Sequence, residues 1–221
     1  MVKLYSGPLS MFGAKAEIAL REKGVEFELH MVAFSQAQGY SPRHPEVLRV
    51  NPKRQVPVLI DDEVELFDST QIFEYVEERW AAPALWPAAR AARAHARQLE
   101  HTSDEVFFPH VIRLMGLRAQ PDPVDSPEWR TARAGIESYY EKTEASLDRR
   151  EYLAGAYTFA DIAFYMAQFF AARHTVPITD AHPNLLAWRG RMAARPPVRG
   201  VIDRMASYLR SIEYPVPDYG A

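Results

Sequence analysis

The chain has 221 residues, which allows one or two domains. Its 26 Lys and Arg residues nearly balance 29 Asp and Glu residues, and the formal net charge of −3 argues against the basic footprint of a dedicated nucleic-acid-binding protein. Because the chain contains no cysteine, it has no disulfide, no Cys-x-x-Cys redox pair and no cysteine nucleophile, so any sulfur chemistry must use a bound thiol.

Strand and helix signals alternate over residues 1–80. Short apolar runs followed by turn residues predict strands, and apolar residues at helical spacing predict helices. The expected elements are a strand at 2–6, a helix at 14–23, a strand within 27–34, an irregular stretch with Gly39, Pro42 and Pro45, strands at 56–60 and 64–67 that form a hairpin, and a helix at 69–80. We therefore expect an α/β domain with the order β-α-β-β-β-α.

Beyond residue 80 the pattern changes to helices alone. Residues 81–88, AAPALWPA, carry two prolines and no charge, as is typical of a linker. Helices are expected at 88–116, 127–150, 159–172, 183–194 and 198–212, with a proline-rich loop at 120–127 and a loosely held tail at 213–221. Pro109 should kink the first helix, because it removes the bond to the carbonyl of Glu105. The expected second domain is an all-helical bundle at 89–221.

The sequence also predicts where the protein resides. Its most apolar stretch, residues 159–172, is too short to span a bilayer core of about 30 Å, and no signal segment precedes the first strand. We expect a soluble, cytoplasmic protein with no membrane or nucleic-acid partner. The seven histidines form no metal-ligand pattern, so no metal is expected.

Pro57 stands at the start of a buried apolar run in the segment NPKRQVPVL at 51–59. Proline is excluded from central strands but is tolerated at a strand start, particularly in the cis form. The backbone N–H and C=O of Val56 would then be free to pair with a peptide ligand as an added strand. The alternative is an ordinary edge-strand proline.

Two predicted helix starts combine a capping residue with a potential anion site. Asp68 or Ser69 suits the N-cap of the helix at 69–80, and Gln71 follows Asp68 at the spacing of a capping box. Ser10 lies just before the first predicted helix, where its hydroxyl and the helix dipole together would stabilise a thiolate. Capping alone explains both positions.

A third helix start has a structural interpretation only. Thr158 and Asp161 have the spacing of an N-cap and its N3 acid, directly before the apolar helix at 159–172. This pattern predicts a folding signal, and we assign it no chemistry.

Taken together, these signals resemble one family, the cytosolic glutathione S-transferases, over essentially the whole chain. The resemblance is carried by NPKRQVPVL at 51–59, FDSTQIFEYVEERW at 67–80 and LAGAYTFAD at 153–161. The segment PLSMFGAKAEIALREKGVEFEL at 8–29 is similar to the serine-type classes, and most similar to the plant phi class. The family implies a thioredoxin-like first domain, an all-helical second domain, a homodimer and a role in detoxification.

The resemblance also implies the site residues. Ser10 falls where the phi class has the serine that activates the thiol of glutathione, the co-substrate. The glutathione-binding positions fall on Arg43 or His44, Lys53, Gln55, Val56, cis-Pro57, Asp68 and Ser69. The pocket for a small hydrophobic electrophile falls on Met11, Phe12, Phe108, Arg113 and Tyr165. The family needs no metal for this chemistry.

One hydroxyl and one helix N-terminus suffice for the implied activation. A free thiol titrates near 8.5, so about 3% is thiolate at pH 7, and lowering that pKa by roughly two units requires about 2.7 kcal/mol. A hydrogen bond to a charged acceptor contributes roughly 1.5–3 kcal/mol, and a helix N-terminus adds roughly 0.3–1 kcal/mol. The thiolate would then attack an electrophilic carbon.

Several alternatives remain open at this stage. Tyr5 ends the first strand and is a second candidate donor to the thiolate, and the site also permits no activation at all. The chain has Arg54 where the family often has glycine, Asp68 where it has glutamate, and a longer segment at 35–45. Since a fold does not fix a function, a non-catalytic scaffold that binds another protein is the alternative to the enzyme.

Overall fold

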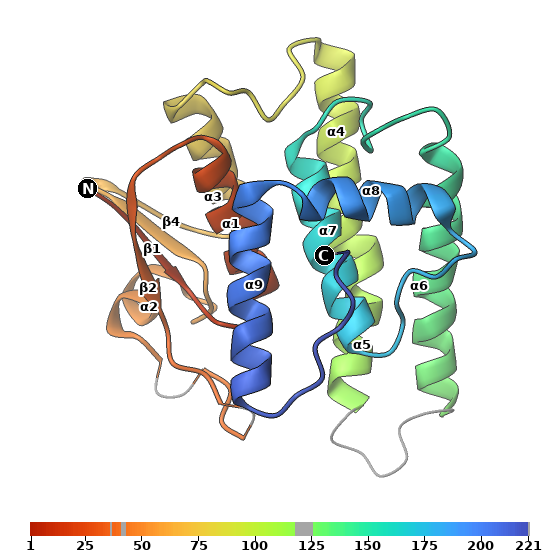
Figure 1. Ribbon diagram of the computed structural model, residues 1–221. Coiled ribbons are helices and arrows are strands. Elements are labelled where there is room, and N and C mark those ends of the chain that lie inside the picture. Colours follow the sequence, from red (N-terminus) through yellow and green to blue (C-terminus); the bar gives the residue numbers. More distant parts are fainter. Residues whose placement is uncertain (36, 41–42, 118–125, 221) are drawn as a thin grey trace. The chain divides into compact units, whose positions relative to one another are not determined.

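The computed structural model describes residues 1–35, 37–40, 43–117 and 126–220. By their internal contacts the residues form two compact units (Figure 1). The first unit contains Met1–Ala84 and Pro196–Tyr214, and the second contains Leu85–Arg195 and Pro215–Ala221. Among the described residues, no helix has both the length and the apolar character needed to cross a membrane.

The first unit is built on a four-stranded mixed sheet, as the expected α/β domain requires. Its elements are β1 (Val2–Ser6), α1 (Met11–Glu22), β2 (Phe27–Met31), α2 (Pro45–Val50), β3 (Val58–Asp61), β4 (Val64–Phe67), α3 (Ser69–Arg79) and α9 (Pro196–Ser211). The strand order is β2-β1-β3-β4, with β2 parallel to β1 and the other neighbours antiparallel. The α/β fold class is confirmed.

One helix of this unit contradicts the prediction. The stretch around Pro45 was expected to be irregular, but α2 begins at Pro45, with His44 as its N-cap. Proline is favoured at the first position of a helix, because the N–H that it lacks would have no helical partner there. The same residue that suggests a loop therefore starts a helix of six residues.

The two faces of the sheet have separate cores. Val2 and Leu4 of β1 pack with Leu20 of α1 and with Ile72 and Val76 of α3. Tyr5 and Val58 pack on the other face with Val47 of α2. Successive strand residues point to opposite faces, so β1 supplies both cores. The last helix, α9, packs against α1 within the same unit.

The regular elements described in the second unit are helices, as predicted. They are α4 (Arg90–Thr102), the π-helical turn η1 (Ser103–Phe107), α5 (Phe108–Leu117), α6 (Pro127–Ser146), α7 (Phe159–Arg173) and α8 (Pro183–Ala193). The interruption expected at Pro109 takes the form of the π-helical turn, in which the N–H of Phe108 donates to the carbonyl of Ser103. Most of the loop expected at 120–127 lies outside the described residues.

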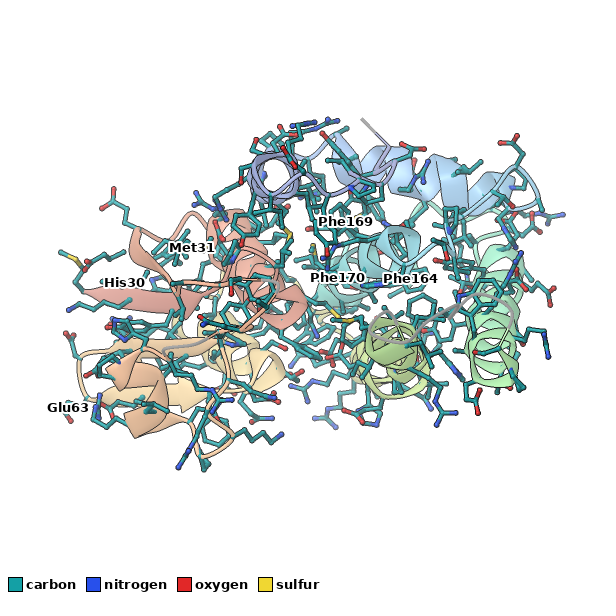
Figure 2. All side chains as sticks on the ribbon, turned by 90° about the horizontal axis from the view of Figure 1, so that it is seen from below. His30, Met31, Glu63, Phe164, Phe169 and Phe170 are labelled. Atoms are coloured by element: carbon teal, nitrogen blue, oxygen red, sulfur yellow. The ribbon has the colours of Figure 1, made fainter. Side chains whose placement is uncertain are left out.

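Helix α7 forms the core of the second unit. Every residue from Phe159 to Ala171 is buried, including Phe164, Phe169 and Phe170 (Figure 2). Thr158 is its N-cap, as predicted, and the carboxylate of Asp161 accepts a hydrogen bond from the N–H of Thr158.

The expectation of a loosely held tail is wrong. Arg189 of α8 pairs with Asp218 at 2.6 Å, and the hydroxyl of Tyr165 donates to the carbonyl of Tyr219 at 2.8 Å. The prolines and the glycine of the tail indicate only that it is not helical. Its anchors lie on α7 and α8, which local sequence does not reveal.

Candidate functional site

Three loops that carry predicted site residues meet at one end of the sheet. Tyr5 of β1 is paired with Val58 of β3, and Val58 is paired with Phe67 of β4, so these residues form one row across the sheet. Since β3 is antiparallel to both neighbours, the end of β1, the start of β3 and the end of β4 lie on the same side of that row. The chain continues there to Ser10, begins β3 behind Pro57, and passes into α3 at Ser69.

Ser10 is the N-cap of α1. The helix begins at Met11, three residues before the predicted start, and the Ser10 hydroxyl accepts a hydrogen bond from the N–H of Gly13 at 3.0 Å. A hydroxyl has one proton to donate and two lone pairs. The proton of Ser10, a residue only 7% exposed, has no acceptor among the described residues. The first turn of α1 contains no acidic side chain, so its positive dipole end is not neutralised there.

Gly13 permits the close approach of α1 to β1. A β-carbon at this position would lie 2.2 Å from the hydroxyl oxygen of Ser6 and 3.0 Å from that of Ser10. Both distances are too short for a non-bonded contact with a methyl group. The glycine therefore brings the first turn of the helix against the end of the strand and keeps space around Ser10.

The Val56–Pro57 bond is cis, as anticipated for a proline at this strand start. Pro57 is buried and Val56 is half-buried. Neither backbone group of Val56 carries a hydrogen bond to another residue within the described ranges. This is the state that pairing with an extended peptide needs.

Asn51 organises the loop before Pro57, a role that the sequence pattern does not predict. Its side chain is 3% exposed, accepts from the N–H of Lys53 at 2.9 Å and donates to the carbonyl of Gln55 at 2.6 Å. Asparagine followed by proline at the end of a helix is the available signal, because a short amide readily bonds the backbone two residues further on. Lys53 and Gln55 are both exposed and are held in place by this side chain.

Arg54 lies in the left-handed region of backbone conformation, with φ 57°. Glycine adopts this region without steric cost. Glycine would therefore suit this position, and Arg54 adopts the same conformation with a side chain attached. Its side chain is exposed beside Lys53 and Gln55.

Asp68 is the N-cap of α3 and has an unusual backbone conformation, with φ 75° and ψ 128°. One carboxylate oxygen accepts from the N–H of Thr70 at 3.0 Å and of Gln71 at 3.3 Å. Ser69 is the first helical residue and is buried. Non-glycine residues in rare conformations cluster at ligand sites, where the surrounding structure holds them.

Arg43 and His44, the two alternative residues predicted to bind glutathione, have different surroundings. Arg43 is exposed and adjoins residues 41–42, which lie outside the described ranges. The neighbouring His44 accepts from the N–H of Glu46 through Nδ1 at 3.2 Å, and its ring lies 4.8 Å from the ring of Tyr5. His44 thus already serves as a helix cap.

Tyr5 lies on the sheet face opposite α1, in the core with Val47. Its ring stacks on His30 at 4.6 Å. Burial raises the pKa of Tyr5, and the negative charges of Glu46 and Glu28 raise that pKa further. A less acidic phenol is a weaker hydrogen-bond donor, so this setting disfavours Tyr5 as the group that stabilises a thiolate.

The residues predicted for the second substrate belong to both units. Met11 is buried and Phe12 half-buried on α1, and Arg113 is exposed on α5. Phe108 packs edge-on against Phe170, and Tyr165 is fully buried. Within the described ranges, no group of three or more His, Cys, Asp or Glu side chains has an arrangement that would hold a metal ion.

Comparisons with known proteins agree with this geometry. The family model "Glutathione S-transferase, N-terminal domain" matches residues 1–78, and the model "Glutathione S-transferase, C-terminal domain" matches residues 102–196. Glutathione S-transferase F10 of Arabidopsis thaliana is 29% identical over 216 residues, which cover 88% of this chain and 94% of the relative. A stringent starvation protein A homolog of Coxiella burnetii is 34% identical over 117 residues, so this chain spans only 52% of its length, and 52% of this chain is matched.

Among solved structures, a glutathione transferase family member from Pseudomonas fluorescens, described with two glutathione molecules bound, has a TM-score of 0.78. It is 26% identical, and the match covers 90% of this chain and 92% of that one. Two family models that together span most of the chain, full-length relatives and a shared fold lead to one conclusion: the chain belongs to the glutathione S-transferase family.

Proposed function

We propose that the protein is a glutathione transferase that activates the thiol of glutathione through Ser10. The observation that carries this proposal is the uncommitted proton of the Ser10 hydroxyl at the N-terminus of α1. The same hydroxyl accepts from the N–H of Gly13, which polarises the O–H bond and improves it as a donor. The thiolate therefore meets a hydroxyl donor and a helix N-terminus together.

Glutathione fits the three loops in an extended form. Three adjacent strands span about 10 Å, and three extended residues reach about the same length. The cysteinyl backbone would pair with Val56 and the γ-glutamyl end would bind at Asp68 and Ser69, where the second carboxylate oxygen of Asp68 can accept from an ammonium group. Gln55 would join Val56 at the cysteinyl backbone, and the glycine carboxylate would meet Lys53 and Arg43 or His44, with Arg54 as an additional cation.

The reaction follows from the bound thiolate. Its sulfur attacks an electrophilic carbon and forms one S–C bond, while the electron pair moves to a leaving group or to the adjacent electron-withdrawing group. We propose small hydrophobic electrophiles as second substrates, with Met11, Phe12, Phe108, Arg113 and Tyr165 as candidate pocket residues. The family relationship further supports a cytoplasmic homodimer with a role in detoxification as part of this proposal.

Two matched variants test the role of Ser10. Ultraviolet titration of the thiolate of bound glutathione should show a pKa well below 8.5 in the natural protein, and a rise of about one to two pKa units in Ser10→Ala. Tyr5→Phe removes the other candidate hydroxyl and should leave this pKa unchanged. A rise in Tyr5→Phe together with no change in Ser10→Ala would refute the assignment of Ser10.

The alternative is a non-catalytic protein with the same fold. The partial match to the stringent starvation protein homolog favours it, because that relative does not carry a transferase name. A scaffold should leave the thiol pKa of added glutathione at its free value. Titration of the natural protein alone therefore separates the two functions.

A further inference from the structure

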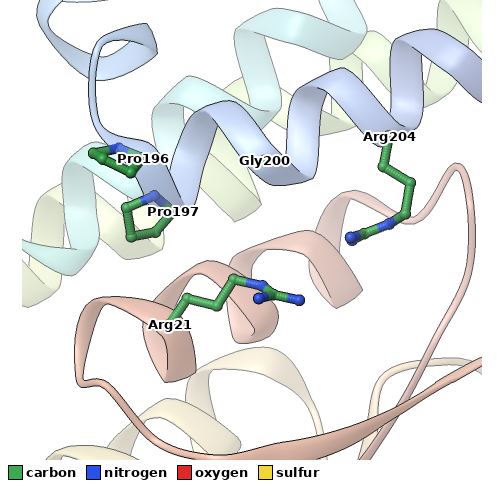
Figure 3. Close-up of a pocket in the computed structure, with 5 residues that line it drawn as sticks. All are labelled: Arg21, Pro196, Pro197, Gly200 and Arg204. Atoms are coloured by element: carbon green, nitrogen blue, oxygen red, sulfur yellow. The ribbon is translucent and has the colours of Figure 1, made fainter.

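A cavity of about 350 Å³ lies between α1 and α9 in the first unit. Its walls come from Arg21 of α1 and from Pro196, Pro197, Gly200 and Arg204 of α9 (Figure 3). It uses none of the residues assigned to glutathione or to the electrophile. A ligand in this cavity would therefore be independent of the proposed function.

The charges around this cavity are not balanced. Glu17 is 1% exposed, and its two carboxylate oxygens pair with Arg21 and Arg204, the former at 2.8 Å. One buried carboxylate thus faces two guanidinium groups, so this trio of side chains carries one net positive charge. The arginine side chains are 41% and 36% exposed, so solvent or a ligand can reach them.

Hydrogen-bond donors also remain available. Arg21 uses Nε for Glu17, and Arg204 uses Nη2. The Nε of Arg204 is buried and has no hydrogen-bond partner among the described residues. A buried donor without a partner is uncommon in proteins and suggests a missing ligand group. Figure 3 shows both arginine side chains in the space between α1 and α9.

The remaining walls are apolar or open. Pro196 and Pro197 begin α9 and offer ring surfaces in place of N–H donors. Gly200 has no atom within 4 Å of the position of a β-carbon, so this part of the helix faces open space. The positive end of the α9 dipole lies at the same side of the cavity.

We propose that this cavity binds a small organic carboxylate with a planar apolar body. A carboxylate matches the planar donor fork of arginine, and one negative charge neutralises the net charge of that trio. A doubly charged phosphate would exceed that balance. The apolar body would pack on the two proline rings and beside Gly200.

Benzoate is a suitable probe, with benzamide as its neutral counterpart. In 15N NMR spectra of the full chain, benzoate should shift the Nε–Hε signals of Arg21 and Arg204 with a dissociation constant in the millimolar range, and benzamide should not. Gly200→Trp, at a position where a β-carbon meets no atom within 4 Å, would place an indole in the cavity and should weaken benzoate binding at least tenfold. Gly190→Trp, at another helical glycine with open space, should leave it unchanged.

Two further measurements decide the ligand class and the location. Inorganic phosphate should bind at least tenfold more weakly than benzoate, and equal binding would overturn the proposed carboxylate. Saturation with S-methylglutathione should leave benzoate binding unchanged, whereas competition would place benzoate in the glutathione site and overturn the α1–α9 site. Unaltered benzoate binding in Gly200→Trp would also overturn the α1–α9 site.

Discussion

The N-termini of α1 and α7 both carry a hydroxyl N-cap, but the two hydroxyls have different partners. At α7 the hydroxyl of Thr158 donates to a carboxylate oxygen of Asp161 at 3.1 Å, so its proton is engaged. At α1 the hydroxyl of Ser10 accepts from Gly13, and its proton has no acceptor within the described ranges. The residue at the third helical position, an acid in α7 and a glycine in α1, makes the difference.

Because of this difference, the N-cap of α7 only stabilises its helix, whereas the N-cap of α1 can also bind an anion. The acid in α7 adds a negative charge at the helix N-terminus and closes a buried network. Glycine in α1 adds no charge, so the helix dipole and the hydroxyl both remain available to an anion. A helix start that has a hydroxyl N-cap but no acid at its third helical position is therefore better suited to stabilise a thiolate.

The largest expected loss of stability follows from removing the hydrogen bonds that Asp161 accepts at the start of α7. Asp161→Ala removes the acceptor of three buried N–H groups, those of Leu153, Thr158 and the Trp188 indole, each at 2.9 Å. Each orphaned buried donor costs about 1–3 kcal/mol, so we expect a loss of at least about 3 kcal/mol in the free energy of unfolding. Urea unfolding followed by circular dichroism measures it.

Asp161→Asn is the matched control for that variant. It keeps one oxygen for Leu153 and Trp188 but places an amide NH2, which is a donor, against the N–H of Thr158. The free energy of unfolding should fall clearly less in Asp161→Asn than in Asp161→Ala. A loss below about 1 kcal/mol in Asp161→Ala would show that the network does not stabilise α7.

The next effect concerns the glycine of α1. In Gly13→Ala the new methyl group would lie 2.2 Å from the Ser6 hydroxyl, which forces the first turn away from β1. We expect a loss of about 1–3 kcal/mol in stability and a higher thiol pKa of bound glutathione, because Ser10 moves with the turn. Gly200→Ala, in open helical space, should instead be neutral or stabilising by about 1 kcal/mol. An unchanged thiol pKa in Gly13→Ala would show that the close packing at Gly13 is not needed for activation of the thiol.

The sequence predicts the bounds of helices and strands better than it predicts the close packing and the unusual backbone conformations at the candidate site. The strands at 2–6 and 64–67 have the predicted bounds, because short apolar runs end there at clear turn residues. The start of α1 was missed by three residues, since Gly13 weakens the helical signal where packing against Ser6 requires it. The left-handed conformation of Arg54 is likewise invisible in a sequence that has no glycine there.

The convergence of the three loops depends on strand register, which no single segment encodes. Tyr5, Val58 and Phe67 share a row only because β3 inserts between β1 and β4. The site positions are predicted instead by the resemblance of the sequence to the glutathione S-transferases. Asn51, which holds the loop before Pro57, was missed because its partners are backbone atoms.

Removing the hydroxyl N-cap of α1 or of α7 should have a smaller effect on stability. The two variants should differ in their effect on bound glutathione. Thr158→Ala and Ser10→Ala should each lower the free energy of unfolding by about 1 kcal/mol, as the loss of an N-cap does. Only Ser10→Ala should raise the thiol pKa of bound glutathione. If Thr158→Ala raised it equally, the pKa change would report general destabilisation rather than a lost donor.

The smallest effect is expected at α2, a third helix start whose cap is His44 rather than a hydroxyl. Arg49 of α2 pairs with Glu46 at 2.6 Å and with Glu65 of β4 at 2.6 Å. Hydrogen bonds from Arg49 lower the pKa of both glutamates. A carboxyl whose pKa is lower in the folded state stabilises that state above its unfolded pKa, about 4.3 for glutamate.

This contribution is therefore complete at neutral pH and is lost as the pH falls from about 5 through the lowered pKa values. The protection factors of the α2 amides in hydrogen exchange, which correct for the slower intrinsic exchange in acid, should fall over that range in the natural protein. Arg49→Gln should lower these protection factors at neutral pH and reduce their dependence on acid. Since Arg49 and Glu65 are exposed and Glu46 is partly exposed, salt screens both ion pairs, and high salt should also lower the protection of the α2 amides. An acid dependence that persists in Arg49→Gln would assign it to other carboxyl groups and leave α2 held by its cap and its apolar contacts alone.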